Sequence, residues 1–177
     1  MFKNVLLVDF NDNEIGFESK ENAHKKPLLH RAFSIFLVNE NKVLLQCRAK
    51  HKYHSGGLVA NSCCSHPTTM ENILSEAKCR LNDELGIDYK GQLKEIGTFI
   101  YFKKFHEELY EYELDHVLVG DYNGNFNINK DEVEWIEWFD IDFIKKDIIE
   151  NPKKYSAWFF NAFKIFLDDR KKNKFNN

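Results

Sequence analysis

The sequence predicts an α+β fold in which a mixed β-sheet is sandwiched between helices, and three observations lead to it. Apolar or alternating runs of strand length fill much of the N-terminal part and return after the middle of the chain. One central segment instead repeats its apolar residues every four positions, which is typical of a helix. The C-terminal part carries two more helical segments, so strands and helices are grouped rather than strictly alternating.

Length and composition favour one domain that acts on a small molecule. A chain of 177 residues corresponds to a single domain, so we expect one unit over 1–177 with a flexible polar tail at 168–177. A net charge of −3 gives no general electrostatic reason to expect binding to nucleic acid. No apolar run approaches the roughly 18 residues that span a bilayer, and the N-terminal pattern is not that of a signal peptide. We expect a cytoplasmic monomer or homodimer that binds neither nucleic acid nor membrane.

Strands are expected in the first part of the chain wherever an apolar run is bounded by turn residues. The predicted strands are 3–9, 15–18, 31–38, 42–48 and 58–66. Asn39-Glu40-Asn41 joins the third to the fourth and is a hairpin signal, while Gly56-Gly57 forms a turn before the fifth. The polar segment 19–29 is expected to be a loop.

The segment 69–86 gives the clearest helical signal. Its apolar residues recur every four positions: Ile73, Ala77, Leu81 and Leu85. Thr68 and Glu71 have the spacing of a capping box at its start, and Gly86 suits the left-handed conformation that ends many helices.

The second half of the chain is expected to return to the sheet and then to end in helices. The predicted strands are 93–102, 109–120 and 134–139. The predicted helices are 140–149 and 156–167, separated by Asn151-Pro152. No internal repeat or linker interrupts this order, which supports a single mixed sheet covered by helices.

The segment Asn61-Ser62-Cys63-Cys64-Ser65-His66-Pro67 combines thiols with an imidazole. If it is extended, Cys64 and His66 project from one face and Cys63 from the other, because side chains alternate along a strand. A thiol and an imidazole would then share one pocket wall. The alternative is that both cysteines are small core residues, as most free cysteines are.

Acidic residues stand at alternate positions of an otherwise apolar predicted strand: Glu111, Glu113 and Asp115. Carboxylates on one strand face repel one another and are costly to bury unless a cation lies between them. Together with His24, His30 and His66, Glu111 and Glu113 would supply three imidazoles and two carboxylates, a set that suits Mn²⁺ or Zn²⁺. A solvated strand face and surface histidines are the alternatives.

Arg80 and Glu84 lie four residues apart on the predicted central helix and therefore share a face. One interpretation is a surface ion pair. In the other, Glu84 holds Mg²⁺ and Arg80 meets a phosphate oxygen.

These motifs, together with Tyr155-Ser156-Ala157-Trp158, resemble the type I isopentenyl-diphosphate delta-isomerases of the Nudix-fold superfamily. The resemblance runs from about residue 3 to 166. The central helix is also similar to a degenerate Nudix box, with Cys79 and Arg80 where hydrolases have Arg-Glu. That departure argues against hydrolysis, which relies on several helix carboxylates to gather Mg²⁺. Departures at Val59, Ala60 and Met70 leave every proposed ligand intact.

The resemblance implies a Nudix-like fold and an isomerase that interconverts isopentenyl and dimethylallyl diphosphate through a tertiary carbocation, in isoprenoid biosynthesis. It implies Cys64 and Glu113 as the catalytic acid/base pair. It implies that a divalent metal is held by His24, His30, His66, Glu111 and Glu113, and that Glu84 helps to hold Mg²⁺ on the diphosphate. The implied substrate-binding residues are Lys20, Arg48, Lys52, Arg80, Tyr101 and Trp158.

Two other functions remain open at this point. A Nudix hydrolase of a nucleoside or isoprenoid diphosphate would use Glu71 and Asp83 as further Mg²⁺ ligands and would release phosphate. A non-catalytic module would bind metal or ligand without turnover.

Overall fold

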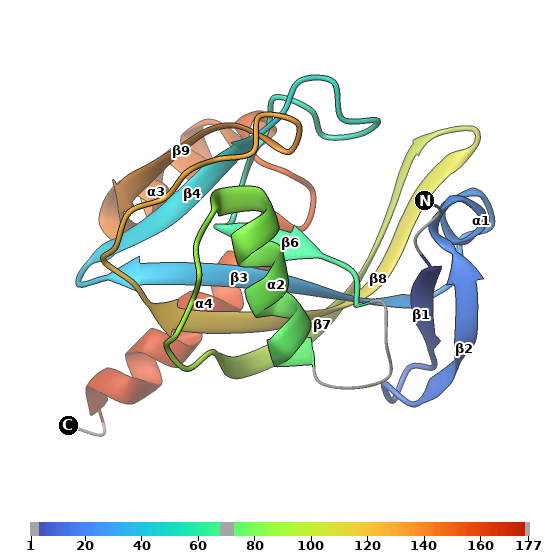
Figure 1. Ribbon diagram of the computed structural model, residues 1–177, viewed down its shortest axis with the longest axis horizontal. Coiled ribbons are helices and arrows are strands. Elements are labelled where there is room, and N and C mark those ends of the chain that lie inside the picture. The colour runs from blue at the N-terminus through green and yellow to red at the C-terminus, as the bar shows by residue number, and fades with distance from the viewer. Residues whose placement is uncertain (1–3, 68–72, 176–177) are drawn as a thin grey trace.

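The computed structural model describes residues 4–67 and 73–175 (Figure 1). Within these ranges the strands are β1 (Asn4–Val8), β2 (Glu14–Ser19), β3 (His30–Asn39), β4 (Lys42–Arg48), β5 (Val59–Ala60), β6 (Cys63–Ser65), β7 (Lys94–His106), β8 (Leu109–Asp121) and β9 (Val133–Asp140). The helices are α1 (Lys20–Lys25), α2 (Ile73–Leu85), α3 (Ile141–Glu150), the 3-10 helix η1 (Pro152–Lys154) and α4 (Phe159–Phe175). None of the described helices is long and apolar enough to cross a bilayer.

One mixed sheet contains all the described strands and is covered by helices on two sides (Figure 1). Successive side chains of β3 point to opposite faces of the sheet, so the sheet has a core on each face. Phe33 and Ile35 pack beneath α2 on one face, and Phe36 packs against Phe159 and Phe163 of α4 on the other. Burying each such side chain contributes about 1.5–3 kcal/mol to folding. The predicted α+β fold, with a mixed sheet between helices, is confirmed.

The pairing of β3 with its neighbours brings distant segments together. β3 runs parallel to β8 with His30 opposite Glu113. It pairs with β4 only at Val38 and Asn39, so the two strands diverge beyond their hairpin. In the space between them, β5 pairs with β4 and β6 pairs with β3. The segment that carries Cys64 is therefore inserted between two diverging strands.

The predicted strand 58–66 is two short strands instead of one. Between them, Asn61 donates from Nδ2 to the Ile35 carbonyl at 3.3 Å, and Ser62 donates from Oγ to the Leu44 carbonyl at 2.6 Å. These buried side chains therefore donate to backbone carbonyls of both flanking strands, β3 and β4. The segment consequently turns from the β4 side to the β3 side.

The prediction that 19–29 is a loop is wrong, because this segment contains α1. The Ser19 side chain caps the helix by accepting from the Asn22 backbone N–H at 3.2 Å. Ala23 and His24 are buried against the sheet. A helix this short is marginal by propensity alone, and packing stabilises it.

The helix α2 lies where its periodicity predicts, and Gly86 follows it with a φ of +63°. A side chain at Gly86 would also meet the Asn127 carbonyl, so both conformation and space favour glycine. The proposed capping residues Thr68 and Glu71, like Met70, lie outside the described residues.

The last helix, α4, continues about two turns beyond its predicted end at residue 167. Residues 168–175, part of the predicted polar tail, are helical. Asp169 pairs with Lys94 at 3.2 Å, and Arg170 donates to the Glu40 carbonyl at 3.2 Å. The polar composition of this segment reflects the exposed surface of a helix that is held at the edge of the sheet.

Asp147 in α3 forms hydrogen bonds with the connection that leads into α4. Its carboxylate accepts hydrogen bonds from Lys154 at 2.5 Å, Tyr155 at 2.6 Å and Asn151 at 2.7 Å. These bonds, with that of Lys154 the largest, hold the pKa of Asp147 below its usual range.

We expect Asp147→Asn to lower the free energy of unfolding at pH 7 by about 1–3 kcal/mol, because charged hydrogen bonds are lost. A lowered native pKa stabilises the fold above the unfolded pKa of about 3.9, and this stabilisation is lost as the pH falls through the native value. Urea denaturation of both proteins should therefore give a difference that shrinks below about pH 4. The exposed Asp142→Asn is the control, and a difference that did not vary with pH would contradict the assignment.

Candidate active site

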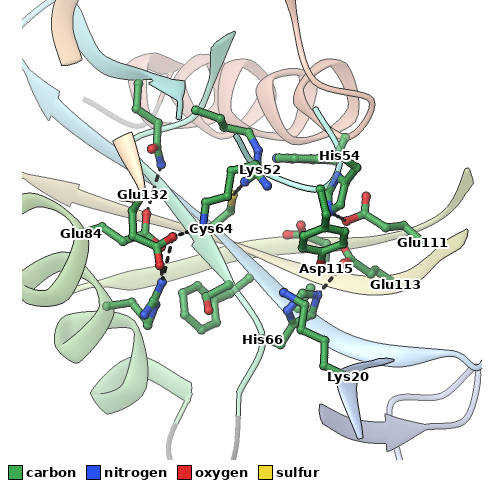
Figure 2. Close-up of a pocket in the computed structure, with 18 of the residues that line it drawn as sticks. Lys20, Lys52, His54, Cys64, His66, Glu84, Glu111, Glu113, Asp115 and Glu132 are labelled. Atoms are coloured by element: carbon green, nitrogen blue, oxygen red, sulfur yellow. Dashed lines mark hydrogen bonds and ion pairs between the residues drawn. The ribbon is translucent and has the colours of Figure 1, made fainter. Parts of the chain in front are cut away.

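A pocket opens between β6, α2 and the ends of β3, β4 and β8, and charged and aromatic side chains line it (Figure 2). The sequence-predicted residues that line it are Lys20, Arg48, Lys52, Cys64, His66, Arg80, Glu84, Tyr101, Glu111, Glu113 and Trp158. The other two predicted residues, His24 and His30, lie next to His66, with ring centroids 5.6 and 5.0 Å away; the His24 ring meets it edge-on and the His30 ring is tilted. The structure therefore gathers all the predicted site residues in one region.

Cys64 lies in the middle of this pocket. In Figure 2 it lies between Glu84 and Glu132 on one side and Glu111 and Glu113 on the other. Burial raises the pKa of the Cys64 thiol to about 12, so the group carries its proton at neutral pH. Its neighbour in sequence, Cys63, is fully buried in the core under α2, as alternation along a strand predicts.

Arg48 stands beside this thiol. Its Nη1 lies 3.8 Å from Cys64 Sγ, and its guanidinium carbon lies 5.2 Å from the centroid of the Trp158 ring. Trp158 is itself held in place, because its Nε1 donates to Asn61 Oδ1 at 3.0 Å. The face of this indole is thus fixed toward the pocket and already accepts a cation.

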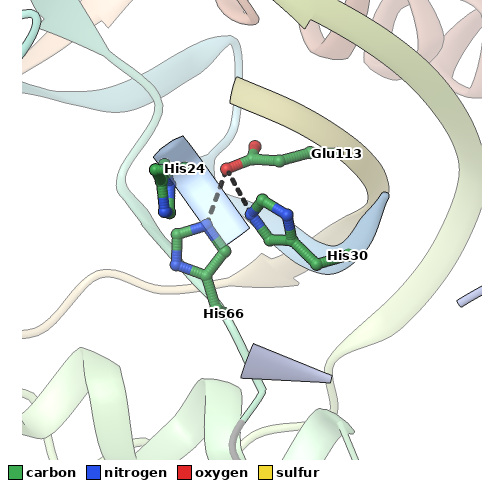
Figure 3. A group of neighbouring side chains, drawn as sticks. All are labelled: His24, His30, His66 and Glu113. Carbon is green, nitrogen blue, oxygen red and sulfur yellow. Dashed lines mark hydrogen bonds and ion pairs between the residues drawn. The ribbon is translucent and has the colours of Figure 1, made fainter. Parts of the chain in front are cut away.

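Four buried or half-buried side chains form a candidate metal centre: His24, His30, His66 and Glu113 (Figure 3). One possible ligand atom from each lies within 4.8 Å of the others. They come from α1, β3, the segment after β6, and β8. The parallel register of β3 and β8 explains why His30 and Glu113 meet, since these two residues are direct partners.

Two of the three imidazoles of this cluster, those of His24 and His30, are oriented as metal ligands require. Nδ1 of His24 lies 2.5 Å from the Lys20 carbonyl, and Nδ1 of His30 lies 2.8 Å from the Leu28 carbonyl. A ring that donates from Nδ1 leaves the lone pair of Nε2 for a metal, and neither Nε2 has a hydrogen-bond partner among the described residues. Burial lowers the pKa of His24 to about 4, so it stays neutral. The cluster fits a divalent ion.

Glu113 connects this cluster to the pocket. Its Oε1 lies 2.6 Å from His66 Nε2 and 3.6 Å from His30 Nε2, while its Oε2 accepts from the Tyr101 hydroxyl at 2.5 Å. Burial alone would raise the pKa of Glu113, but the neighbouring His66 and His30 outweigh burial and hold it well below its usual range.

Glu111, the fifth predicted metal ligand, is not part of the four-residue group. Its Oε1 lies 2.8 Å from His54 Nε2, and its Oε2 accepts from Tyr101 at 2.8 Å. It points into the same pocket as Glu113. Its assignment as a ligand stays a prediction.

The opposite end of the pocket holds basic side chains paired with carboxylates. Arg80 Nη2 lies 2.6 Å from Glu84 Oε1, and Gln46 Nε2 donates to Glu84 Oε2 at 3.3 Å. Lys52 forms a close ion pair with Glu132. Two of the four cations that are predicted to bind a diphosphate, Lys52 and Arg80, are thus held in place by acidic partners in the pocket itself.

Several pocket residues were not predicted from the sequence: Gln46, His54 and Glu132. Asp115 lies on the predicted strand face, although no role was predicted for it. The Ser34 hydroxyl donates to its carboxyl at 2.9 Å, and burial raises its pKa well above the usual range. Alternation of apolar and polar residues was the signal for Asp115. No spacing pattern links His54 or Glu132 to its partner, because those contacts join segments that are distant in sequence.

This chain is similar in sequence to a known domain family and to named proteins, and similar in fold to solved structures. Residues 28–159 match the NUDIX domain family. An "Isopentenyl-diphosphate Delta-isomerase 2" from Aromatoleum aromaticum is 43% identical, over 87% of this chain and 81% of that protein. An "Isopentenyl-diphosphate Delta-isomerase" from Serratia proteamaculans is 40% identical, over 90% of this chain and 89% of that protein.

Solved structures share the fold at much lower sequence identity. A MutT protein from Methanosarcina mazei superposes with a TM-score of 0.64 at 14% identity, covering 81% of this chain and 96% of that one. The similarity at this level is one of fold, since the two sequences differ at most positions.

Proposed function

Because the chain belongs to the isopentenyl-diphosphate Delta-isomerases of the NUDIX domain family, we propose that Cys64 and Glu113 carry the protons of its reaction. The reaction is the interconversion of isopentenyl diphosphate and dimethylallyl diphosphate. It moves a carbon-carbon double bond by one position through a tertiary carbocation. The observation that carries the proposal is that a protonated thiol and a carboxylate, from β6 and β8, line the same pocket.

The chemistry needs a proton donor, a proton acceptor and a group that stabilises positive charge without attacking it. One proton is added to the terminal carbon of the double bond, and another is removed from the carbon on the other side of the cationic centre. Cys64 and Glu113 provide the two proton-transfer groups. Trp158 offers an aromatic face, whose attraction for a desolvated cation is worth about 2 kcal/mol; the Arg48 guanidinium over that ring supports this role.

We propose that His24, His30, His66 and Glu113 hold a divalent metal, with Glu111 as a further ligand. An ion bound there would supply the positive charge that lets two carboxylates lie close together in a buried site. The imidazole and carboxylate donors favour Mn²⁺ or Zn²⁺. The residues themselves orient Glu113: His66 and His30 face its Oε1, and Tyr101 holds its Oε2.

The diphosphate of the substrate is proposed to bind among the basic side chains of the pocket. Lys20, Arg48, Lys52 and Arg80 would contact its oxygens, and Glu84 would share Mg²⁺ with it. Binding energy gained there, away from the reacting carbons, positions the double bond for proton transfer. We further propose that the protein works in the cytoplasm as a monomer or homodimer.

The hydrolase alternative has less support in the structure. It requires Asp83 as a Mg²⁺ ligand, but the Asp83 side chain is 55% exposed and pairs with Arg80 at 3.4 Å. Glu71, the other carboxylate that this alternative needs, lies outside the described residues.

Incubation in D₂O with isopentenyl diphosphate, Mg²⁺ and Mn²⁺ tests the reaction and the substrate together. We expect dimethylallyl diphosphate with deuterium in a methyl group, followed by NMR, and no release of phosphate. Phosphate or diphosphate release without the allylic product would support the hydrolase instead. Metal binding by the folded protein with no turnover would support a non-catalytic module.

A further inference from the structure

His54 is a buried imidazole in the pocket wall to which the proposed mechanism gives no role. It lies on the segment between β4 and β5, and its side chain is 3% exposed. We propose that His54 is a positioning residue, which acts through Glu111 and Tyr101 to fix the carboxylate of Glu113. This inference rests on the proposed function, because it concerns the same proton-transfer group.

The His54 ring is fixed by its neighbours. Its centroid lies 4.8 Å from that of Phe105 and 4.4 Å from that of Tyr53, which meets it edge-on. The Trp158 ring lies 6.2 Å away, also edge-on. The ring therefore has little freedom to move, and its Nε2 stays directed at Glu111 (Figure 2).

A continuous chain of contacts leads from this ring to Glu113. His54 Nε2 lies 2.8 Å from Glu111 Oε1, at a contact where both side chains are 3% exposed. The other oxygen of Glu111 lies 2.8 Å from the Tyr101 hydroxyl, which lies 2.5 Å from Glu113 Oε2. The same Glu113 carboxylate directs its Oε1 at the histidine cluster.

Tyr101 cannot donate to both neighbouring carboxylates at once, and for this reason Glu111 needs a second donor, His54. The Tyr101 hydroxyl has one proton but lies within hydrogen-bond distance of two carboxylates. A Glu111 without another partner would be a buried carboxylate that competes for this proton, which is costly in a site of low polarity. The N–H of His54 satisfies Glu111 from the other side and fixes the plane of its carboxylate. Tyr101 is then held in place against Glu113.

Two substitutions separate hydrogen bonding from packing. His54→Gln keeps an N–H donor near the position of Nε2 and loses the ring. His54→Phe keeps a ring against Phe105 and Tyr53 and loses the donor. His51→Ala is the matched control, because His51 is exposed and its Nε2 lies beside the Asp131 carbonyl.

Each protein is purified, its folding is checked by thermal unfolding, and kcat and KM for isopentenyl diphosphate are measured. Residues next to a metal ligand typically change activity or metal affinity by about 10–100-fold. We expect His54→Phe to lower kcat by about that factor, with little change in KM, because no hydrogen bond or ion pair joins His54 to a basic side chain among the described residues. His54→Gln should recover most of the loss, and His51→Ala should match wild type. In a second arm, titration of the metal-free proteins with Mn²⁺ should give a dissociation constant about tenfold higher for His54→Phe than for His54→Gln.

The two arms keep this inference distinct from the proposed function. Failure of the wild-type protein to turn over substrate would overturn the proposed function, and the Mn²⁺ titration would still decide on His54. Wild-type kcat and Mn²⁺ affinity in His54→Phe would overturn the inference, as would a folded His54→Gln that is as impaired as His54→Phe. If His54→Phe does not fold, a tenfold loss of kcat in folded His54→Gln overturns it, and wild-type kcat there supports it.

Discussion

Cys64→Ala is expected to reduce kcat at least a hundredfold, with the protein still folded, because positioned acid-base groups contribute about 10²–10⁴-fold to a rate. The thiol faces the pocket rather than the core, so its removal leaves little unfilled space among packed side chains. Turnover of isopentenyl diphosphate under saturating substrate and metal gives the rate, and circular dichroism reports the fold.

The control for this prediction is Cys79→Ala, which removes an exposed thiol from α2. It should keep the wild-type rate. Substantial activity in folded Cys64→Ala would show that the proton at this side of the substrate comes from another group.

The second large effect is expected from Glu113→Gln. The amide keeps the size of the side chain but cannot exchange a proton in the same way, so kcat should fall by about 10²–10⁴-fold. An amide is also a poorer ligand than a carboxylate, so the purified protein should retain less Mn²⁺ or Zn²⁺ after dialysis. Elemental analysis measures the metal, and the product is followed by NMR.

Glu107→Gln supplies the matched control, since its side chain is 91% exposed at the tip of the same hairpin. It should change neither rate nor metal content. If Glu113→Gln kept its metal and its rate, both roles assigned to Glu113 would have to be abandoned.

Local patterns in the sequence predicted much of this site, because it lies on regular elements. Alternation along a strand put Cys64 and His66 on one pocket wall and put Glu111 and Glu113 on one face. The four-residue period of α2 placed Arg80 beside Glu84, which the structure shows at 2.6 Å. These inferences required only the periodicity of strands and helices.

The rest depended on contacts that no local pattern contains. The helix α1 is six residues long and gains its stability from burying Ala23 and His24. The loop before β5 brings His54 to Glu111, whose partner could not be read from spacing. The division of the predicted strand at Asn61 and Ser62 depends on carbonyl groups of β3 and β4 that the segment itself does not specify.

The candidate metal centre extends beyond the residues that match the NUDIX domain. The NUDIX match covers residues 28–159, which include His30, His66 and Glu113, whereas His24 lies on α1, before that region begins. Lys20, at the start of the same helix, also reaches the pocket from outside the match. The matched residues alone therefore hold three of the four side chains of this cluster. In modular terms, a short capped helix outside the matched domain contributes one of the four side chains of the candidate metal centre.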